Sequence, residues 1–276
     1  MITFPHIGFI GRLGNQMFQY AAFFGMANKH QCEMRLNNPN IELYKCFDLK
    51  TKVFSCYNSK FDCPHGLDGS VAVGGHSIMI KTEEQNARLL NTHFDSEFFE
   101  INHDGKSLLG FFQNSKYFMH CEEELRKEFT FRPKYDKVAD MYVSENFDEV
   151  IALHIRRTDY INSHVLNNLD INYYKEALDH FDDSLPVLIF SDDPEWCKER
   201  DIFRGERFKF MESSDTFLDL AIMSKCDYHI IANSSYSWWG AWLADSKKTV
   251  CPKQWFLPYC DYIDSDGLRL PHWIVI

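Results

Sequence analysis

The sequence VIALHIRRTD at residues 150–159 is the clearest indication of the fold class. Its first six residues, 150–155, form a short and mostly apolar run, which is typical of a strand buried on both faces. Such strands belong to parallel sheets that helices cover. The polar residues 156–159 follow the run directly and therefore lie at the carboxyl end of the strand, where ligands of open parallel sheets bind.

Strand and helix patterns alternate through the rest of the second half. We expect strands at 186–190, 228–232 and 249–251, and helices at 172–181, 215–226 and 235–244. Another helix should begin near Pro194, because Asp192 and Asp193 are cap-type residues and proline suits the first helical position. The alternation indicates an α/β fold with a parallel sheet and helices on its faces.

The first half gives weaker patterns. We expect a strand, a glycine loop and a helix at 7–10, 11–16 and 17–29, and a strand and a helix at 108–112 and 115–129. The second of these helices should end at Arg132-Pro133. Between residues 37 and 75, prolines and glycines interrupt every periodic run, so we expect loops and short strands there.

Composition limits the class of protein. With 276 residues, of which 45% are hydrophobic, the chain can bury one large core or two compact ones. A net charge of −11 argues against a nucleic acid as partner. Neither a charged leader nor an apolar run of about 18 residues is present, so no transmembrane segment and a cytoplasmic location are expected. The nine cysteines show no CxxC spacing, and we expect reduced thiols.

The adjacent Arg156 and Arg157 are the sharpest chemical feature. Two guanidinium groups offer fixed forks of donors that match phosphate oxygens, and beside a buried strand they need an anion or a carboxylate. A diphosphate would supply that charge. Salt bridges to this acidic protein's own carboxylates would supply it equally well, and spacing alone leaves both readings open.

Two further clusters carry the same ambiguity. The loop at 11–16 holds Arg12 and Asn15 beside two glycines, which suits close approach to an anion or a hydroxyl but also suits an ordinary turn. The segment at 233–240 places Ser234 and Ser235 before a predicted helix, where they could hold a phosphate or simply cap the helix. Asp192 and Asp193 are likewise either caps or acceptors for a guanine or ribose group.

These motifs together resemble the bacterial-type α-1,2-fucosyltransferases, within the wider group of α-1,2, α-1,6 and protein O-fucosyltransferases. The resemblance covers nearly the whole chain. Its most specific parts are GRLGNQMFQY at 11–20 and HIRRTD at 154–159. It also includes GFFQ at 110–113 with KYF at 116–118, Tyr173-Tyr174, FSDD at 190–193 and WWG at 238–240. Thr158 stands where the family often has a glycine.

The resemblance implies a GT-B architecture, two Rossmann-like lobes with a cleft between them. We place the boundary near residue 148. Residues 1–148 would form the acceptor-side lobe and residues 149–276 the lobe that binds GDP-fucose.

The resemblance also implies roles for individual residues. Arg156 and Arg157 would pair with the diphosphate, and at least one of them would stabilise charge on departing GDP. His154, Asp192 and Ser234 or Ser235 would contact guanosine or phosphate. Arg12 and Asn15 would lie across the cleft near the transferring fucose.

The expected reaction transfers L-fucose from GDP-β-L-fucose to the 2-hydroxyl of a terminal β-galactoside in α-1,2 linkage, with inversion of the anomeric centre. No general base stands out, and Asn15 or Asp159 is the candidate to assist. We expect no cofactor and no metal, because the arginine would do the electrostatic work of an ion. GDP-fucose and a β-galactoside glycan are the expected partners, with peripheral membrane association if the glycan is lipid-linked.

Other functions remain open on the sequence. A metal-dependent transferase could use Asp264-Ser265-Asp266, although a solvated turn is the simpler reading of that segment. A noncatalytic carbohydrate-binding protein would suit the 16% aromatic content but gives the arginine pair no task. A transferase that uses another nucleotide sugar is a third alternative. A dinucleotide oxidoreductase is set aside, because residues 8–14 do not spell GxGxxG.

Overall fold

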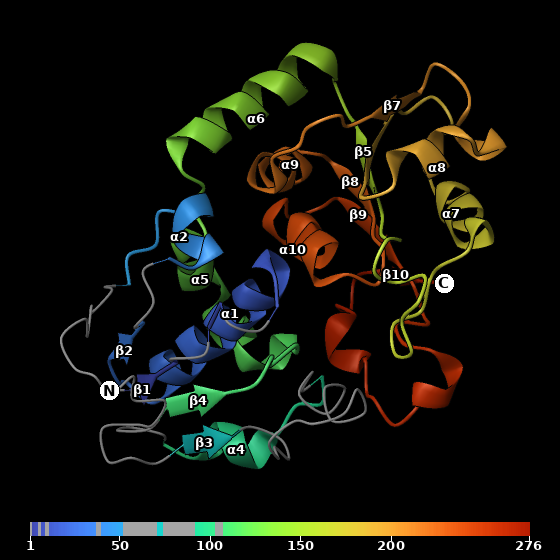
Figure 1. Cartoon of the computed structure of the whole chain (residues 1–276). Coiled ribbons are helices and arrows are strands. Elements are labelled where there is room, and N and C mark those ends of the chain that lie inside the picture. The colour runs from blue at the N-terminus through green and yellow to red at the C-terminus, as the bar shows by residue number, and fades with distance from the viewer. Residues whose placement is uncertain are drawn as a thin grey trace. The chain divides into compact units, whose positions relative to one another are not determined.

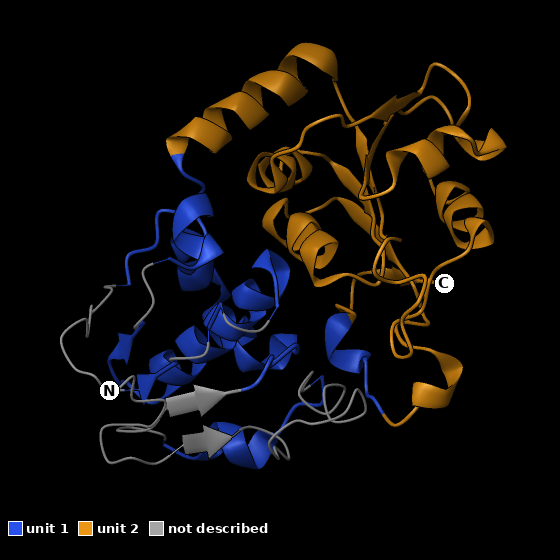
Figure 2. Ribbon diagram, in the orientation of Figure 1, with its two compact units in different colours: residues 1–132, 263–268 blue, residues 133–262, 269–276 orange. Residues whose placement is uncertain are grey.

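The chain forms two compact units in the computed structural model (Figure 2). One unit comprises residues 1–132 and 263–268, and the other comprises residues 133–262 and 269–276. The structure describes residues 2–4, 7–8, 11–36, 40–51, 71–73, 92–102 and 107–276. We call the units unit 1 and unit 2 and describe each by itself.

Unit 2 is built on a six-stranded parallel sheet with the order β10-β9-β8-β5-β6-β7. Its strands are β5 (Ile151–Ile155), β6 (Val187–Ser191), β7 (Phe208–Phe210), β8 (Tyr228–Ile230), β9 (Lys248–Cys251) and β10 (Ile274–Val275). From the central β5 the chain proceeds outward through β6 and β7, then returns to the other side of β5 with β8. Ile151 therefore pairs with both Val187 and Tyr228. The point where the order reverses, between β5 and β8, is the switch point of a doubly wound sheet.

Helices cover both faces of this sheet (Figure 1). The helices α7 (Ile171–Leu178) and α8 (Pro194–Lys198) lie on one face, and α9 (Thr216–Met223) and α10 (Ser235–Leu243) lie on the other. The strand β5 is buried at all five positions, as the apolar run predicts. Its alternate residues Ile151, Leu153 and Ile155 join the core on the α7 side. The intervening His154 therefore faces α10.

Side-chain caps explain where the unit 2 helices begin. Asp170 caps α7, Asp193 caps α8, Asp215 caps α9 and Ser234 caps α10, each by accepting a hydrogen bond from an amide in the first turn. Pro194 occupies the first position of α8, as predicted. The predicted strands and helices of residues 150–251 are all confirmed, with ends that shift by a few residues.

Unit 1 has a four-stranded parallel sheet with the order β2-β1-β4-β3. Its strands are β1 (Ile2–Thr3), β2 (Met34–Arg35), β3 (Val71–Val73) and β4 (Ser107–Leu109). The helices are α1 (Leu13–Lys29), α2 (Glu42–Cys46), α4 (Ser96–Glu100) and α5 (Glu122–Glu128), with 3-10 turns at Ser115–Tyr117, Met119–Cys121 and Asp266–Leu268. Aromatic side chains form much of its core, and Phe4 makes edge-to-face contacts with Phe23 and Phe112.

Two expectations for unit 1 were wrong. Ile7 and Gly8 form a turn rather than part of a strand, because the amide of Ile7 bonds to the carbonyl of Phe4 and Gly8 has a φ of 84°. Phe9 and Ile10 lie outside the described residues. The expected helix at 115–129 is interrupted, because Phe118 has the non-helical angles φ −137° and ψ −9°. Only Glu122–Glu128 is α-helical in that segment.

The boundary between the units also differs from the expected one near residue 148. Pro133 ends no helix but begins α6 (Pro133–Asn146), a helix that the sequence analysis missed. The helix belongs to unit 2, because it packs on α9 and Lys225 reaches its Asp136 and Asp140 at 2.7 and 2.8 Å. The chain therefore first passes from unit 1 into unit 2 between Arg132 and Pro133. Within the described ranges, no helix is both long and apolar enough to cross a membrane.

Candidate active site

The switch point of unit 2 brings two polar loops together. The segment after β5 carries the arginine pair, and the segment after β8 runs into the first turn of α10. Because β5 and β8 are adjacent and parallel, both segments leave the same edge of the sheet. This edge is where an open α/β sheet binds its ligand.

Arg156 is held by two carboxylates. Its Nη2 lies 2.6 Å from Oδ1 of Asp159, and its Nη1 lies 3.2 Å from Oδ2 of Asp192. The side chain of Arg156 is 18% exposed. The Tyr160 ring lies near it, with 5.7 Å between Cζ and the ring centroid. The guanidinium is thus oriented by two carboxylates and an aromatic ring.

Asp192 ties the two strand-end segments to each other. Its Oδ1 accepts the amide of Arg157 at 2.9 Å, and its Oδ2 accepts the amide and the hydroxyl of Thr158 as well as Arg156. Although burial raises the pKa of Asp192, the hydrogen bond from Thr158 and the charge of Arg156 bring it below its ordinary value. The carboxylate is therefore ionised and occupied within the protein. This geometry fits an organising residue as well as a ligand for the donor.

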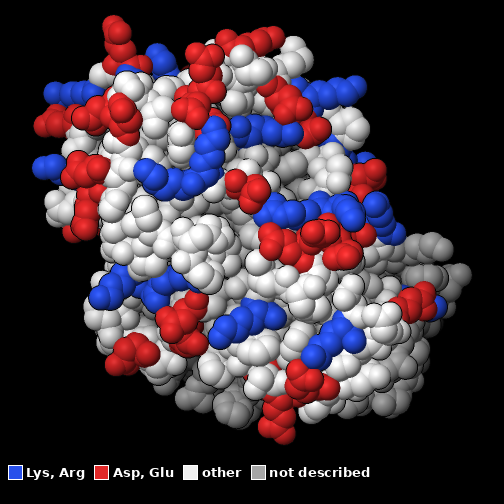
Figure 3. All heavy atoms as spheres, turned by 180° about the vertical axis from the view of Figure 1, so that it is seen from behind, with Lys and Arg blue, Asp and Glu red and all other residues white. Residues whose placement is uncertain are grey.

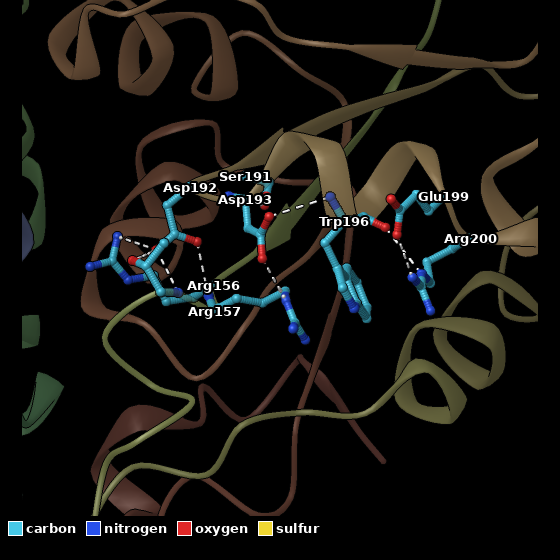
Figure 4. Close-up of polar contacts among 9 residues, drawn as sticks. Arg156, Arg157, Ser191, Asp192, Asp193, Trp196, Glu199 and Arg200 are labelled. Atoms are coloured by element: carbon cyan, nitrogen blue, oxygen red, sulfur yellow. Dashed lines mark hydrogen bonds and ion pairs between the residues drawn. The ribbon is translucent and has the colours of Figure 1, made fainter.

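Arg157 pairs with the next carboxylate along (Figure 4). Its Nε donates to Oδ2 of Asp193 at 3.1 Å, and Oδ1 of Asp193 caps α8 by accepting the amide of Trp196. The two consecutive arginines after β5 thus form ion pairs with the two consecutive aspartates after β6, Arg156 with Asp192 and Arg157 with Asp193. Salt bridges to the protein's own carboxylates, one of the two readings open from the sequence, are present in the structure.

His154 is buried on the α10 side of β5 and is 6% exposed. Its ring centroid lies 5.6 Å from that of Tyr236, in the first turn of α10. Burial and the nearby charge of Arg156 lower the pKa of His154 to about 3, so the imidazole is neutral at pH 7. Its Nδ1 is buried and has no hydrogen-bond partner among the described residues. A buried polar atom of this kind indicates a position that a ligand or a water completes.

The segment after β8 is held by Tyr160 and Asn233. The hydroxyl of Tyr160 donates to the carbonyl of Asn233 at 3.1 Å, and Nδ2 of Asn233 donates to the carbonyls of Asn167 and Trp255. Ser234 caps α10, and Ser235 is its first residue, so both predicted serines stand at the start of a nine-residue helix. A helix start of this kind favours negative charge.

Asp219 was not among the residues predicted from the sequence. This residue lies near the start of α9, and its Oδ1 is buried without a partner in the part of the chain that the structure describes. Burial raises the pKa of Asp219 to about 6. A hydrogen bond from Ser213 opposes this rise in the pKa, and the negative charge of Asp215 adds to it. The hydroxyl of Tyr236 donates to the carbonyl of Thr216 at 2.6 Å and so links the starts of α9 and α10. No sequence pattern marks Asp219, because an acidic residue near a helix start is ordinary.

The other predicted residues belong to unit 1. Arg12 is exposed just before α1, and Asn15 is in the first turn of that helix. Gly11 has a φ of 82°, and a Cβ atom there would lie 2.5 Å from Asn15, so only glycine fits. Oδ1 of Asn15 accepts Nε2 of Gln113 at 2.7 Å. Two motifs of the resemblance, GRLGNQ and GFFQ, are therefore in direct contact within this unit.

The segment Asp264-Ser265-Asp266 forms a turn. Oδ1 of Asp264 accepts the amide of Asp266 at 2.8 Å, and its Oδ2 lies 3.4 Å from Nδ1 of His93. Within the described ranges, no group of three His, Cys, Asp or Glu side chains is arranged to hold a metal ion. Acidic and basic side chains are interspersed on the face of the molecule shown in Figure 3, so positive charge there is local rather than continuous.

Two α/β units, each with its own parallel sheet, agree with the GT-B fold that the resemblance implies. The crystal structure of POFUT1 in complex with GDP has this fold: it superposes with a TM-score of 0.54 at 14% identity, over 88% of this chain and 95% of that one. The sequence model of glycosyl transferase family 11 matches residues 81–276, and the chain belongs to that family. The resemblance to the α-1,2-fucosyltransferases is thereby confirmed.

Named relatives differ in the sugar that they transfer. The alpha-1,2-colitosyltransferase of Escherichia coli is 30% identical over 270 residues, which cover 89% of this chain and 90% of that protein. The galactoside alpha-(1,2)-fucosyltransferase 1 of Alouatta caraya is 24% identical over 96% of this chain and 73% of its own length. Both names specify a 1,2 linkage.

Proposed function

We propose that the protein transfers L-fucose from GDP-β-L-fucose to the 2-hydroxyl of a terminal β-galactoside, in α-1,2 linkage and with inversion. The observation that carries this proposal is the position of Arg156. It is a guanidinium oriented by two carboxylates at the switch point of a doubly wound sheet, on the edge of the sheet from which α10 begins. Both relatives' names support the 1,2 linkage, and the name of the Alouatta caraya relative supports fucose as the sugar.

The chemistry requires that negative charge be stabilised on the departing GDP. A guanidinium forms bidentate hydrogen bonds with phosphate oxygens, and in a half-buried position it acts with little screening. Arg156 would bind the β-phosphate, and Ser234, Ser235 and the first amides of α10 would bind the diphosphate on its other side. This arrangement makes a metal ion unnecessary, and we propose metal-independent transfer.

His154 and Asp219 suit the nucleoside. The neutral imidazole of His154 has a buried Nδ1 that can accept or donate one hydrogen bond. The unpartnered Oδ1 of Asp219 can accept the N–H groups on the Watson–Crick edge of guanine, which adenine does not present in that pattern. We assign base recognition to Asp219. Asp192 is assigned mainly to holding Arg156 and the 157–158 amides in place.

Asp159 and Asn15 are the candidates to assist the acceptor hydroxyl. Asp159 is 49% exposed and is paired with Arg156 at 2.6 Å, which favours a role in orienting that arginine over a role as base. Asn15 and Arg12 are assigned to the fucose end of the donor. Other residues of unit 1 would bind the acceptor, and residues of unit 2 would bind the GDP part of the donor.

A second donor is favoured by a specific observation, the 30% identity to a colitosyltransferase. Colitose is L-fucose without the 3-hydroxyl. A site that hydrogen-bonds this hydroxyl rejects the analogue that lacks it by roughly 10⁴-fold, whereas an apolar site discriminates weakly. Comparison of the two donors therefore measures which of these sites the protein has.

The deciding experiment measures GDP release from GDP-fucose and GDP-colitose in excess EDTA, with and without lactose or N-acetyllactosamine. We expect acceptor-dependent release with GDP-fucose, and loss of that release in Arg156→Ala. If GDP is released from GDP-colitose and not from GDP-fucose, the donor assigned here is wrong but the protein is still a glycosyltransferase. GDP release that requires a divalent ion would refute metal independence, and glycan binding without any GDP binding would support a noncatalytic carbohydrate-binding protein.

A further inference from the structure

The indole of Trp196 lies between two guanidinium groups (Figure 4). Cζ of Arg157 is 3.8 Å from the ring centroid, and Cζ of Arg200 is 4.9 Å from it. A guanidinium within about 6 Å of an indole centroid is attracted to the ring face, most strongly where water is excluded. The side chain of Arg157 is 15% exposed, against 35% for Arg200, so the contact with Arg157 is the better shielded of the two.

Hydrogen bonds link the same residues into one set. Asp193 accepts the amide of Trp196 with Oδ1 and Nε of Arg157 with Oδ2. Arg200 donates its Nε to the carbonyl of Trp196 at 3.1 Å, and its Nη2 to Glu199 at 3.0 Å. These hydrogen bonds hold the backbone of Trp196 in α8, and the Arg157 side chain is held by its contact with the indole and by its ion pair with Asp193.

This set bears on Arg156 through the backbone. Arg156 and Arg157 are consecutive in the segment after β5, and their side chains pair with the consecutive Asp192 and Asp193. The amide of Arg157 is bonded to Asp192, which also contacts Arg156. When the Arg157 side chain is held on Trp196, the peptide that joins the two arginines has little freedom, and the direction of Arg156 is set with it.

We propose that Trp196 is a positioning residue for the transfer reaction, acting through Arg157 to fix the segment that carries Arg156. This inference rests on the proposed function. Stabilisation of a leaving group depends on donors that are in place before the reaction, and a displacement of about 1 Å can reduce the rate by roughly 100-fold. Loss of the indole face should therefore affect turnover more than binding of the donor.

The test compares Trp196→Leu, which removes the aromatic face, with Trp196→Phe, which keeps one. For Trp196→Leu we expect kcat to fall about tenfold or more. The KM for GDP-fucose should stay within about threefold of the wild-type value, and each chain should still bind about one GDP molecule. Trp196→Phe should recover most of the loss. Tyr228→Leu is the matched control, because it removes a ring under Lys247 (5.6 Å to the centroid) at the amino-terminal edge of the same sheet.

Two results would overturn the proposal: a kcat for Trp196→Leu equal to that of the wild type, or a loss explained wholly by fewer GDP-binding chains. The second result would show that Trp196 serves folding alone. If Trp196→Leu does not fold, Trp196→Met replaces it, because the unbranched and flexible methionine side chain adapts better to the space left by the indole. The same comparison with Trp196→Phe then decides. A wild-type protein that releases no GDP from GDP-fucose contradicts the proposed function itself, whereas an active wild type with unaffected Trp196 variants contradicts only this inference.

Discussion

At the scale of single residues, the structure separates two arginines that the sequence presents as equals. Arg156 is paired with Asp159 and Asp192, whereas Arg157 is stacked on Trp196 and paired with Asp193. The sequence could show that both need negative partners, because guanidinium groups beside a buried strand are costly alone. Which partner each one takes depends on how the segment after β6 meets the segment after β5.

Arg156→Ala should lower kcat by roughly 10²- to 10³-fold, the usual cost of removing one donor that stabilises developing charge. Arg156→Lys should lose less, since the charge remains and only the planar fork is lost. Steady-state kinetics with GDP-fucose and lactose measure both effects. Arg204→Ala is the control, because Arg204 is 72% exposed in a surface pair with Asp201. Equal kcat for the wild type and Arg156→Ala would remove the arginine from the mechanism.

Asp219→Asn should weaken GDP binding by roughly 10- to 100-fold, because charge-assisted hydrogen bonds to a buried carboxylate are lost, and should reduce the preference for GDP over ADP. The wild type should also bind GDP less well as the pH falls through 6, since the pKa of Asp219 is raised to about 6 and only the ionised form accepts two hydrogen bonds. Isothermal titration between pH 5 and 8 tests this. A pH profile that is the same for the wild type and the variant would rule out base recognition by Asp219.

At the scale of helices and strands, the elements with clear local burial patterns were the ones that could be predicted from the sequence. The run at 150–155 and the capped helices of unit 2 were predictable, because continuous apolar strands and Asp or Ser caps are local signals. The helix α6 was not foreseen. Its buried side chains, Tyr135 and Ala139, are few, and its place is determined by packing on α9 and by the ion pairs of Lys225. These are contacts between segments far apart in the chain, which no local pattern reports.

The strand β8 contributes an acid-sensitive element. His229 is fully buried, with Nε2 donating to the carbonyl of Met223 at 2.9 Å and Nδ1 2.8 Å from the Ser246 hydroxyl. Burial lowers the pKa of His229 to about 4, whereas the unfolded chain titrates near 6.5. Protons therefore bind the unfolded state first, and stability that is present above pH 6.5 is lost as the pH falls toward 4.

We expect the wild type to lose about 2 kcal/mol of unfolding free energy through His229 between pH 7.5 and pH 5. His229→Gln has no titrating group at this position and should show a correspondingly smaller loss. Urea unfolding followed by tryptophan fluorescence at the two pH values measures the difference between the variants. Parallel pH dependences for the two proteins would show that His229 does not contribute.

At the scale of the whole molecule, the chain is two units with separate sheets and separate cores. The division has a useful spectroscopic consequence. All six tryptophans (196, 238, 239, 242, 255 and 273) lie in unit 2, so their fluorescence reports the unfolding of that unit. Proteins with two units need not unfold in one step.

GDP at about 100 times its Kd should stabilise the unit that binds it by about 2.7 kcal/mol. Because we place the GDP site in unit 2, GDP should raise the midpoint of the tryptophan transition by roughly 5–10 °C. Far-ultraviolet circular dichroism reports both units. If unit 1 has a separate transition, GDP should leave its midpoint temperature unchanged. The assignment of the donor to unit 2 would be refuted by a tryptophan transition that GDP does not shift.

The α/β class, the parallel sheet of unit 2 and the polar segments at its carboxyl edge were all predictable from the amino acids alone, because hydrophobic periodicity and helix caps are short-range properties. The family was predictable too, through motifs from Gly11 to Gly240. Four features were visible only in the folded chain: the different surroundings of Arg156 and Arg157, the occupation of Asp192 within the protein, the unsatisfied oxygen of Asp219 and the place of Trp196 between two guanidinium groups. Those facts depend on burial and on the crossing of segments distant in sequence, and both arise only when the chain has folded.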